Sequence, residues 1–315
     1  MNLNEETRNG YTISSKMKEI WSMELQMTKL VLDVCKKYNL RIWVEGGTLL
    51  GTVRHQGFIP WDDDIDLIMP RDDYEKLLTI ANKEFKTPYF FQCAYTDTEY
   101  YRGHAQLRLD NTAAILSKDS FNTFHQGIFI DIFCFDSVPD IVDDKWNKKL
   151  RRADEIQHIL GYCSYRLSVF SNPKNLFYRL LYLYYKTTNK TLELFKEYEN
   201  LFKGSEYKDS KFVGYPTFLR TNSERTTRKK EWFSQTIYLP FEDIVVPVPI
   251  GYAEILKKQY GENYMTPIRI PPLHGGEILF DTKKSYKDYL PELRKKKIEE
   301  FKRNRIEKIK KLLKL

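Results

Sequence analysis

Three aspartates stand in segments that are otherwise apolar. Asp64 and Asp66 alternate with apolar residues in DIDLIMP, and Asp131 is the charged residue within GIFIDIF. Because side chains alternate along a strand, Asp64 and Asp66 are expected on one face of a sheet. A carboxylate in apolar surroundings needs a cation or hydrogen-bonding partners. The pattern therefore predicts a divalent-cation site, with Mg²⁺ or Mn²⁺ held by Asp64, Asp66 and Asp131.

The same three carboxylates suit phosphoryl transfer. Mg²⁺ is commonly held by one or two carboxylates together with substrate phosphates and water, and two-metal phosphoryl chemistry uses several such acids. Asp131 is open to three roles: metal ligand, base for an attacking hydroxyl, or a buried acid paired with an arginine. Asp62 is expected to reach a second metal ion or to cap the turn. An EF-hand loop starting at Asp62 is excluded, because Leu67 occupies the position that requires glycine.

A glycine turn precedes the acidic segment. Gly46, Gly47 and Thr48 follow the short segment RIWVE and open a helical segment. Glycines let backbone N–H groups approach a phosphate closely, and a helix N-terminus attracts negative charge. Gly46, Gly47 and Thr48 are therefore predicted to contact a phosphate group. Glu45 is expected to be a further acidic ligand or a residue that orients a base.

Three basic residues are candidates for contacts with the same phosphate group. Arg54 would contact a phosphate or brace the acidic loop. Arg108, in the strand-like segment AQLRL, is expected to point toward the metal-binding face. His274 lies in the loop PPLHGG and is either structural or part of the site. Asp136 follows Asp131 in the same apolar run and is expected to begin a turn.

The surrounding sequence supplies elements that would position these residues. The apolar spacing from Lys16 to Tyr38 predicts an amphipathic helix, and Asn39 can cap its C-terminus. A second helix is predicted for residues 71–85. Strands are predicted for residues 41–45, 64–70, 89–93, 105–109 and 127–136. This order indicates an α/β (α+β) fold with a mixed sheet.

The residue composition and the predicted secondary structure change along the chain, which predicts four parts. Residues 1–142 would form the catalytic core, and residues 143–210, rich in Tyr, Leu, Lys and Arg, a helical insertion. Residues 211–290 return to short mixed elements and would complete the active site. Residues 291–315 would form a basic amphipathic C-terminal helix.

The motifs resemble those of a known family. A glycine turn between a strand and a helix, followed by alternating aspartates on the next strand, is similar to the nucleotidyltransferase-fold signature. The stretch EGGTLLGTVRHQGFIPWDDDIDL closely resembles the core motif of the LicD family of phosphocholine and CDP-alcohol phosphotransferases, relatives of the fukutin-type transferases. The resemblance is dense from Val44 to Tyr74 and continues loosely through QLRLDNT, GIFIDIF and PPLHGG. It implies a nucleotidyltransferase-like core and does not cover the helical insertion or the tail.

The resemblance also implies a reaction. A phosphoalcohol group, of the phosphocholine, phosphoethanolamine or aminoethylphosphonate type, would pass from a CDP-alcohol donor to a sugar hydroxyl, releasing CMP. The acceptor would be a cell-surface glycan (capsular polysaccharide, lipopolysaccharide or teichoic acid) or its lipid-linked precursor. Asp64 and Asp66 would be metal ligands and Asp131 the third acid, and the glycine turn would hold the diphosphate of the donor. Two alternatives stay open: a glycosyltransferase that binds a sugar nucleotide through the Asp-x-Asp pair, and a non-catalytic glycan- or membrane-binding relative.

The positive charge is concentrated in the tail. Of a net charge of +8, residues 291–315 contribute +7, from eleven Lys and Arg against four acids. The apolar residues of this tail fall on one side of a helical wheel, which predicts a helix docked on the body or one lying on an anionic membrane through residues 294–315. Nucleic-acid binding is not expected, because Phe301 is the one aromatic residue among these charges.

Other features favour a cytoplasmic protein. If the tail binds lipid, the protein would lie peripherally on the inner face of the membrane. The first residues contain no apolar segment of the signal-peptide type. No apolar run approaches the ~18 residues of a membrane span. The four cysteines are scattered without metal-binding spacing, as expected for reduced, buried thiols.

Overall fold

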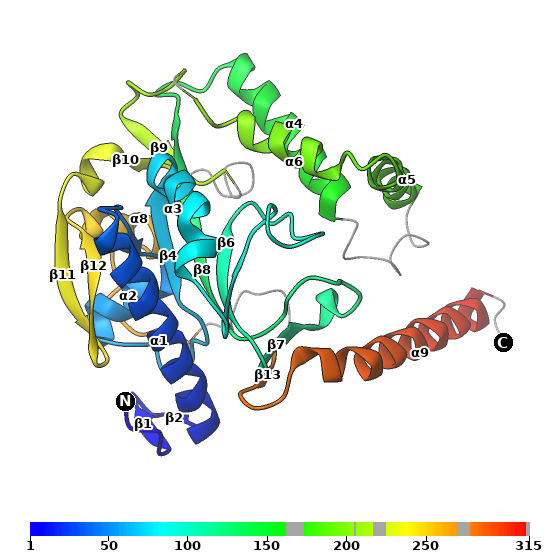
Figure 1. Cartoon of the computed structure of the whole chain (residues 1–315), viewed down its shortest axis with the longest axis horizontal. Coiled ribbons are helices and arrows are strands. Elements are labelled where there is room, and N and C mark those ends of the chain that lie inside the picture. Colours follow the sequence, from blue (N-terminus) through cyan, green and yellow to red (C-terminus); the bar gives the residue numbers. More distant parts are fainter. Residues whose placement is uncertain (162–172, 205, 217–224, 270–277, 313–315) are drawn as a thin grey trace.

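A mixed sheet forms the centre of the molecule. The computed structural model describes residues 1–161, 173–204, 206–216, 225–269 and 278–312. Within these residues, seven strands form one sheet whose main path is β10-β9-β8-β4-β3, while β6 pairs with both β8 and β5 (Figure 1). The strands are β3 (Trp43–Val44), β4 (Asp66–Pro70), β5 (Tyr89–Gln92), β6 (Ala105–Leu109), β8 (Phe129–Val138), β9 (Phe212–Gly214) and β10 (Arg228–Lys229).

Strand β8 brings together residues from separate parts of the chain. β4 runs parallel to it, with Asp66 opposite Asp131. β6 runs antiparallel to β8 and places Gln106 opposite Asp131 as well. Residues directly opposite each other share a face of a sheet, so Asp66, Asp131 and Gln106 form a row across three strands.

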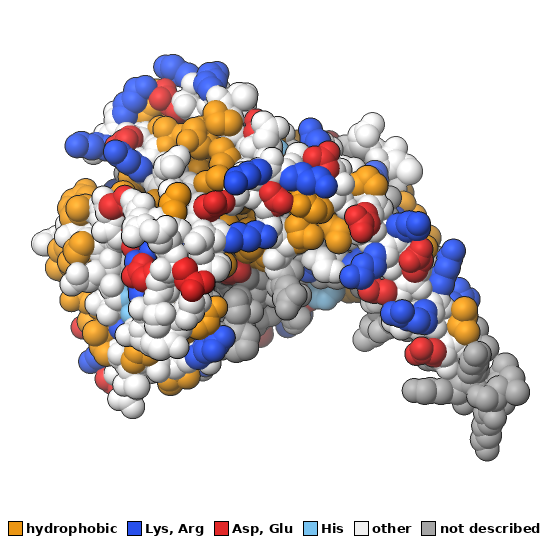
Figure 2. All heavy atoms as spheres, turned by 90° about the horizontal axis from the view of Figure 1, so that it is seen from below, with side chains coloured by type: hydrophobic (Ala, Val, Ile, Leu, Met, Phe, Trp, Pro, Cys, Tyr) orange, Lys and Arg blue, Asp and Glu red, His pale blue; other side chains and the backbone are white. Residues whose placement is uncertain are grey.

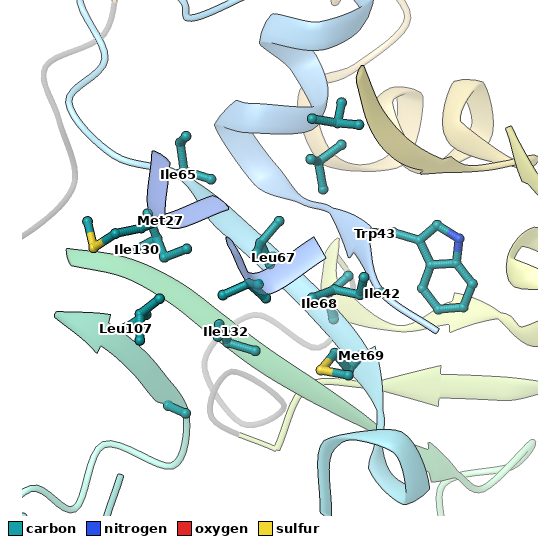
Figure 3. Close-up of a cluster of buried hydrophobic side chains, with 14 of the residues drawn as sticks. Met27, Ile42, Trp43, Ile65, Leu67, Ile68, Met69, Leu107, Ile130 and Ile132 are labelled. Atoms are coloured by element: carbon teal, nitrogen blue, oxygen red, sulfur yellow. The ribbon is translucent and has the colours of Figure 1, made fainter. Parts of the chain in front are cut away.

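Helix α1 (Ser15–Lys37) packs against the sheet through its apolar side. Ser14 Oγ caps the helix by accepting a hydrogen bond from Met17 N at 3.2 Å. Figure 3 shows Met27 of α1 in the same buried cluster as Ile65 and Ile130 of the sheet region. Each such fully buried side chain contributes roughly 1.5–3 kcal/mol. Asn39 has a φ of +52° just after the helix, as expected for its C-terminal cap.

Two helices flank β4 in the sequence. Helix α2 (Gly46–His55) begins directly after β3 and contacts β4, while helix α3 (Arg71–Glu84) begins directly after β4 and contacts β4 and β8. Arg71 binds Asp136 in β8 with two hydrogen bonds, of 2.9 and 2.6 Å. The expectation that Asp136 begins a turn is therefore wrong, because it lies inside β8 and its charge is satisfied by Arg71.

Three helices form a separate group with its own apolar cluster. Their buried side chains include Trp146, Ile156, Tyr182 and Phe195. Tyr101 and Val138, from the region of the sheet, join the same cluster. The division of the chain into four parts stays a prediction. The helices are α4 (Asp144–Gly161), α5 (Pro173–Thr187) and α6 (Thr191–Asn200).

The C-terminal third returns to the main body. Buried residues of the β11-β12 hairpin and α8, among them Phe241, Val246 and Leu256, belong to the same cluster as α1 and the central sheet. The base of α9 packs on β7 through Tyr286 and Leu290. These elements are β11 (Thr236–Phe241), β12 (Ile244–Pro249), α8 (Tyr252–Tyr260), β13 (Ile278–Asp281), which pairs with β7 (Ala113–Leu116), and α9 (Tyr286–Leu312).

The mixed α/β prediction is confirmed, and the predicted strands and helices appear with shifted ends. A hairpin of β1 (Glu6–Arg8) and β2 (Tyr11–Ile13) was not predicted; Asn9 and Gly10 in its turn have φ values of +50° and +70°. Asn-Gly is a strong signal for such a turn. Among the described helices, none has the length and apolar character needed to cross a bilayer.

Candidate active site

Asp64, Asp66 and Asp131 come together where β4 and β8 begin. One carboxylate oxygen of each lies within 4.8 Å of the others. Asp66 and Asp131 are opposite each other in the parallel ladder, and Asp131 N donates to Ile65 O at 2.9 Å, which extends the pairing to the segment that carries Asp64. The side chains predicted to bind metal are thus neighbours, and three carboxylate oxygens are a suitable donor set for Mg²⁺ or Mn²⁺.

Burial and mutual repulsion oppose ionisation in this cluster. Burial raises the pKa of Asp64 well above its usual value, and neighbouring carboxylates, Asp62 first, raise it further. Burial also raises the pKa of Asp66, followed by the charges of Asp64 and Asp131. Burial opposes ionisation of Asp131 too, but its partners, His104 first, outweigh it and the pKa of Asp131 is lowered. A divalent cation would stabilise all three anions, so this environment fits one.

Two side chains near β6 orient Asp131. Gln106 Nε2 donates to Asp131 Oδ1 at 2.6 Å. His104 Nε2 lies 3.2 Å from the same oxygen. Neither residue could be identified from the sequence, because both reach Asp131 only through the pairing of β6 with β8.

Arg108 lies behind Gln106 and is 2% exposed. Its Nη2 donates to Gln106 Oε1 at 2.5 Å, which directs the Gln106 amide nitrogen toward Asp131. Its other donors bind Gln92 Oε1 at 2.7 Å and Gly127 O at 2.6 Å. Burial lowers the pKa of Arg108 to about 10. The expected contact of Arg108 with a diphosphate stays a prediction. In the structure its hydrogen bonds hold Gln106, which in turn binds Asp131.

The glycine turn makes room for the carboxylates. Gly46 has a φ of +54°, and a Cβ at this position would lie 2.9 Å from Asp66 Oδ2. A Cβ on Gly47 would lie 2.4 Å from Asp62 Oδ2. Thr48 Oγ1 accepts a hydrogen bond from Asp66 N at 2.8 Å. The N-terminus of α2, where backbone donors and the helix dipole attract anions, therefore adjoins the acidic cluster.

The family profile "LicD/FKTN/FKRP, nucleotidyltransferase domain" matches residues 39–160. These residues form a LicD-family domain. The chain is 29% identical over 266 residues to lipopolysaccharide cholinephosphotransferase LicD of Haemophilus influenzae, covering 81% of this chain and 94% of that relative. It is 45% identical over 42 residues to ribitol 5-phosphate transferase FKRP of Homo sapiens, covering 13% of this chain and 8% of that relative. The second match is confined to a short part of both proteins.

Glu45 anchors the LicD domain to the C-terminal region. Its carboxylate accepts two hydrogen bonds from Arg228, each of 2.6 Å, and both side chains are buried. Arg228 Nη2 also donates to Gln259 Oε1 of α8 at 2.9 Å. Glu45 precedes Gly46 directly, so this ion pair fixes the backbone where the glycine turn starts. The two roles expected for Glu45, a further acidic ligand or a residue that orients a base, stay predictions.

The other basic candidates differ in placement. Arg54 Nη1 donates to Tyr264 O at 2.9 Å, and its Nε donates to His55 Nε2 at 2.9 Å. Arg54 therefore braces the segment after α8, while its phosphate contact stays a prediction. Burial, followed by the charge of Arg54, lowers the pKa of His55 to about 4. His274 lies outside the described residues.

A further acid lies close to the cluster. Glu24 of α1 is 1% exposed, and its Oε2 has no hydrogen-bond partner among the described residues. Burial raises the pKa of Glu24 well above its usual value, and Asp64 is the next cause. The sequence could have indicated that Glu24 is buried, because Glu24 occurs four residues after Ile20 and three before Met27, within the apolar stripe of the predicted helix.

Proposed function

We propose that this protein is a metal-dependent phosphotransferase that moves a phosphoalcohol group from a CDP-alcohol to a hydroxyl of a cell-surface glycan or its lipid-linked precursor. The observation that carries the proposal is the cluster of Asp64, Asp66 and Asp131 beside the N-terminus of α2, inside a LicD-family domain. Its relatives named cholinephosphotransferase and ribitol 5-phosphate transferase support this class of reaction, because both names describe transfer of a phosphoalcohol.

Asp64, Asp66 and Asp131 would hold Mg²⁺ or Mn²⁺, which when bound supplies positive charge to the phosphate oxygens. The acceptor oxygen forms a bond to the phosphorus that carries the alcohol. The bond from this phosphorus to the bridging oxygen breaks, and CMP leaves with that oxygen. The proton of the acceptor hydroxyl passes to a carboxylate of the cluster.

The remaining residues bind or position. Backbone donors of Gly46, Gly47 and Thr48 stabilise the anionic diphosphate at the helix N-terminus. Arg54 and His274 are proposed as further contacts of the diphosphate. His104 and Gln106 hold Asp131 in its ionised form with a fixed orientation, and Arg108 in turn fixes Gln106 through hydrogen bonds.

A donor screen tests the proposal. The protein is incubated with a glycan acceptor, Mg²⁺ and, in turn, CDP-choline, CDP-ethanolamine, CDP-glycerol or CDP-ribitol, and CMP release is measured. We expect release with one donor, loss of release with EDTA or in Asp64→Asn, and normal release in Asp72→Asn, an exposed acid of α3. Release of a nucleoside diphosphate from a sugar nucleotide would instead identify a glycosyltransferase. Absence of both turnover and Mn²⁺ binding would point to a non-catalytic relative.

We also propose that residues 294–315 bind an anionic membrane, which would suit a lipid-linked acceptor. The base of α9 is docked, since Arg294 donates to Ser120 O at 2.6 Å and to Asn122 O at 3.0 Å. The rest of α9 extends away from the body (Figure 1) and forms an arm covered with Lys and Arg side chains and some acids (Figure 2). A chain ending at Lys297 keeps the docking contacts. At low salt it should sediment less with anionic vesicles than the full chain does, and it should keep its activity on a soluble acceptor.

A further inference from the structure

Helix α5 carries large apolar side chains on two opposite sides. On its inner side Tyr182 is 1% exposed and packs in the apolar cluster of the helical group, with Leu181 beside it. A helix that is apolar all round is normally covered all round. Its outer side nevertheless carries five large apolar side chains that are 38% to 58% exposed, namely Leu176, Phe177, Leu180, Leu183 and Tyr184.

These five residues, called here the outer face of α5, form one continuous stripe. At 100° per residue, their positions fall within an arc of roughly 120° that contains no charged residue. Figure 1 shows α5 at the end of the molecule away from β11 and β12, on the same side as the projecting arm of α9. The outer face is therefore a preformed apolar surface on a helix that is already held by its inner side.

The charges around the outer face have one sign. From Ile156 to Leu192 the sequence contains five Lys and Arg and no Asp or Glu. Within α5, the Arg179 guanidinium lies 5.3 Å from the centre of the Tyr182 ring. Lys186 forms an ion pair with Glu99, whose side chain is 9% exposed. Glu99 offsets one of the five positive charges, and the remaining positive charge of the segment complements a negatively charged surface.

We propose that the outer face of α5 inserts into the interfacial layer of an anionic lipid bilayer. Phe, Tyr and Leu on one side with Lys and Arg nearby are the composition of helices that lie in a membrane interface. The fifteen residues of α5 span about 22 Å, less than the ~30 Å of a bilayer core, so the helix would lie flat. A second copy of the chain is a poorer fit, because it would bring two segments of net positive charge together. Vesicle binding needs no substrate, so this inference stands apart from the proposed reaction.

The test compares two pairs of exposed apolar residues in the full chain. The test variant is Phe177→Ser with Leu180→Ser, at positions that are each 58% exposed. The matched control is Tyr238→Ser with Val245→Ser in the β11-β12 hairpin, at positions 68% and 58% exposed. Co-sedimentation with vesicles of phosphatidylcholine and phosphatidylglycerol should fall about tenfold or more for the test variant and stay at the wild-type level for the control. The difference should persist at about 0.5 M salt, where charge interactions of α9 are screened.

Three results would overturn the proposal. The first is wild-type protein that does not sediment with these vesicles, and the second is equal binding by the test variant and the control. The third is a dimer in analytical ultracentrifugation that the α5 substitutions dissociate while vesicle binding is retained, which would assign the face to a second copy. If the double variant does not fold, as judged by its thermal melting, the single variant Leu180→Gln is measured with the same expectations.

Discussion

Replacing Gly46 by alanine is expected to weaken cation binding more than it weakens the fold. Gly46 has a φ of +54°, and the added Cβ would lie 2.9 Å from Asp66 Oδ2. An L-residue in the left-handed region costs roughly 1–2 kcal/mol, and the short contact forces the Asp66 carboxylate to move. We therefore expect the free energy of unfolding to fall by about 1–2 kcal/mol. The affinity for Mn²⁺ should fall about 10- to 100-fold, as for other changes beside a ligand.

Gly10→Ala is the matched control for this experiment. Gly10 has a φ of +70°, but nothing lies within 4 Å of an added Cβ. The control should therefore lose similar stability and keep its affinity for Mn²⁺. Urea unfolding measures the stability of both variants, and calorimetric titration measures Mn²⁺ binding. The reasoning is refuted if Gly46→Ala binds Mn²⁺ as tightly as the wild type, or if Gly10→Ala loses as much affinity.

Three further predictions concern the acids and their support. Asp64→Asn, Asp66→Asn and Asp131→Asn should each abolish transfer, and a normal rate in any of them would contradict its role. In the metal-free protein Asp64→Asn and Asp66→Asn should keep the melting temperature, because a repelling charge is removed. Asp131→Asn should lower it, because the favourable interaction with His104 is weakened. Mn²⁺ at about 100 times its Kd should stabilise the wild type by about 2.7 kcal/mol, and differential scanning calorimetry should show no such gain for Asp64→Asn. Arg228→Met should cost about 3–5 kcal/mol in urea unfolding, because it leaves Glu45 buried without its partner, and adding Glu45→Gln should restore part of the loss.

The acidic cluster could be predicted because its signals are local. Alternation in DIDLIMP places Asp64 and Asp66 on one face, and an acid in an apolar strand needs a partner wherever that strand pairs. The parallel register that sets Asp66 opposite Asp131 agrees with both arguments. The glycine turn was equally visible in the sequence. Its observed role includes making space for Asp66, which spacing alone does not reveal.

The groups that support the cluster could not be predicted, because strand pairing and long-range packing select them. Gln106 reaches Asp131 only since β6 pairs with β8, and Arg228 is 183 residues from its partner Glu45. Asp136 was misplaced for the same reason: its partner Arg71 is 65 residues away and lets the acid stay within a strand. Each of these contacts depends on the assembled sheet.

The matched region, residues 39–160, is therefore too short to build the site alone. Glu45 is inside it, but the arginine that neutralises Glu45 is in β10. A domain cut at these limits would lose the ion pair that fixes the backbone directly before the glycine turn. It would also lose α1 and the β11-β12 hairpin, whose Met27 and Phe241 belong to the main apolar cluster. The alignment with the Haemophilus influenzae relative covers 266 residues and is therefore much longer than the matched region. This greater length agrees with the dependence of the site on the rest of the chain.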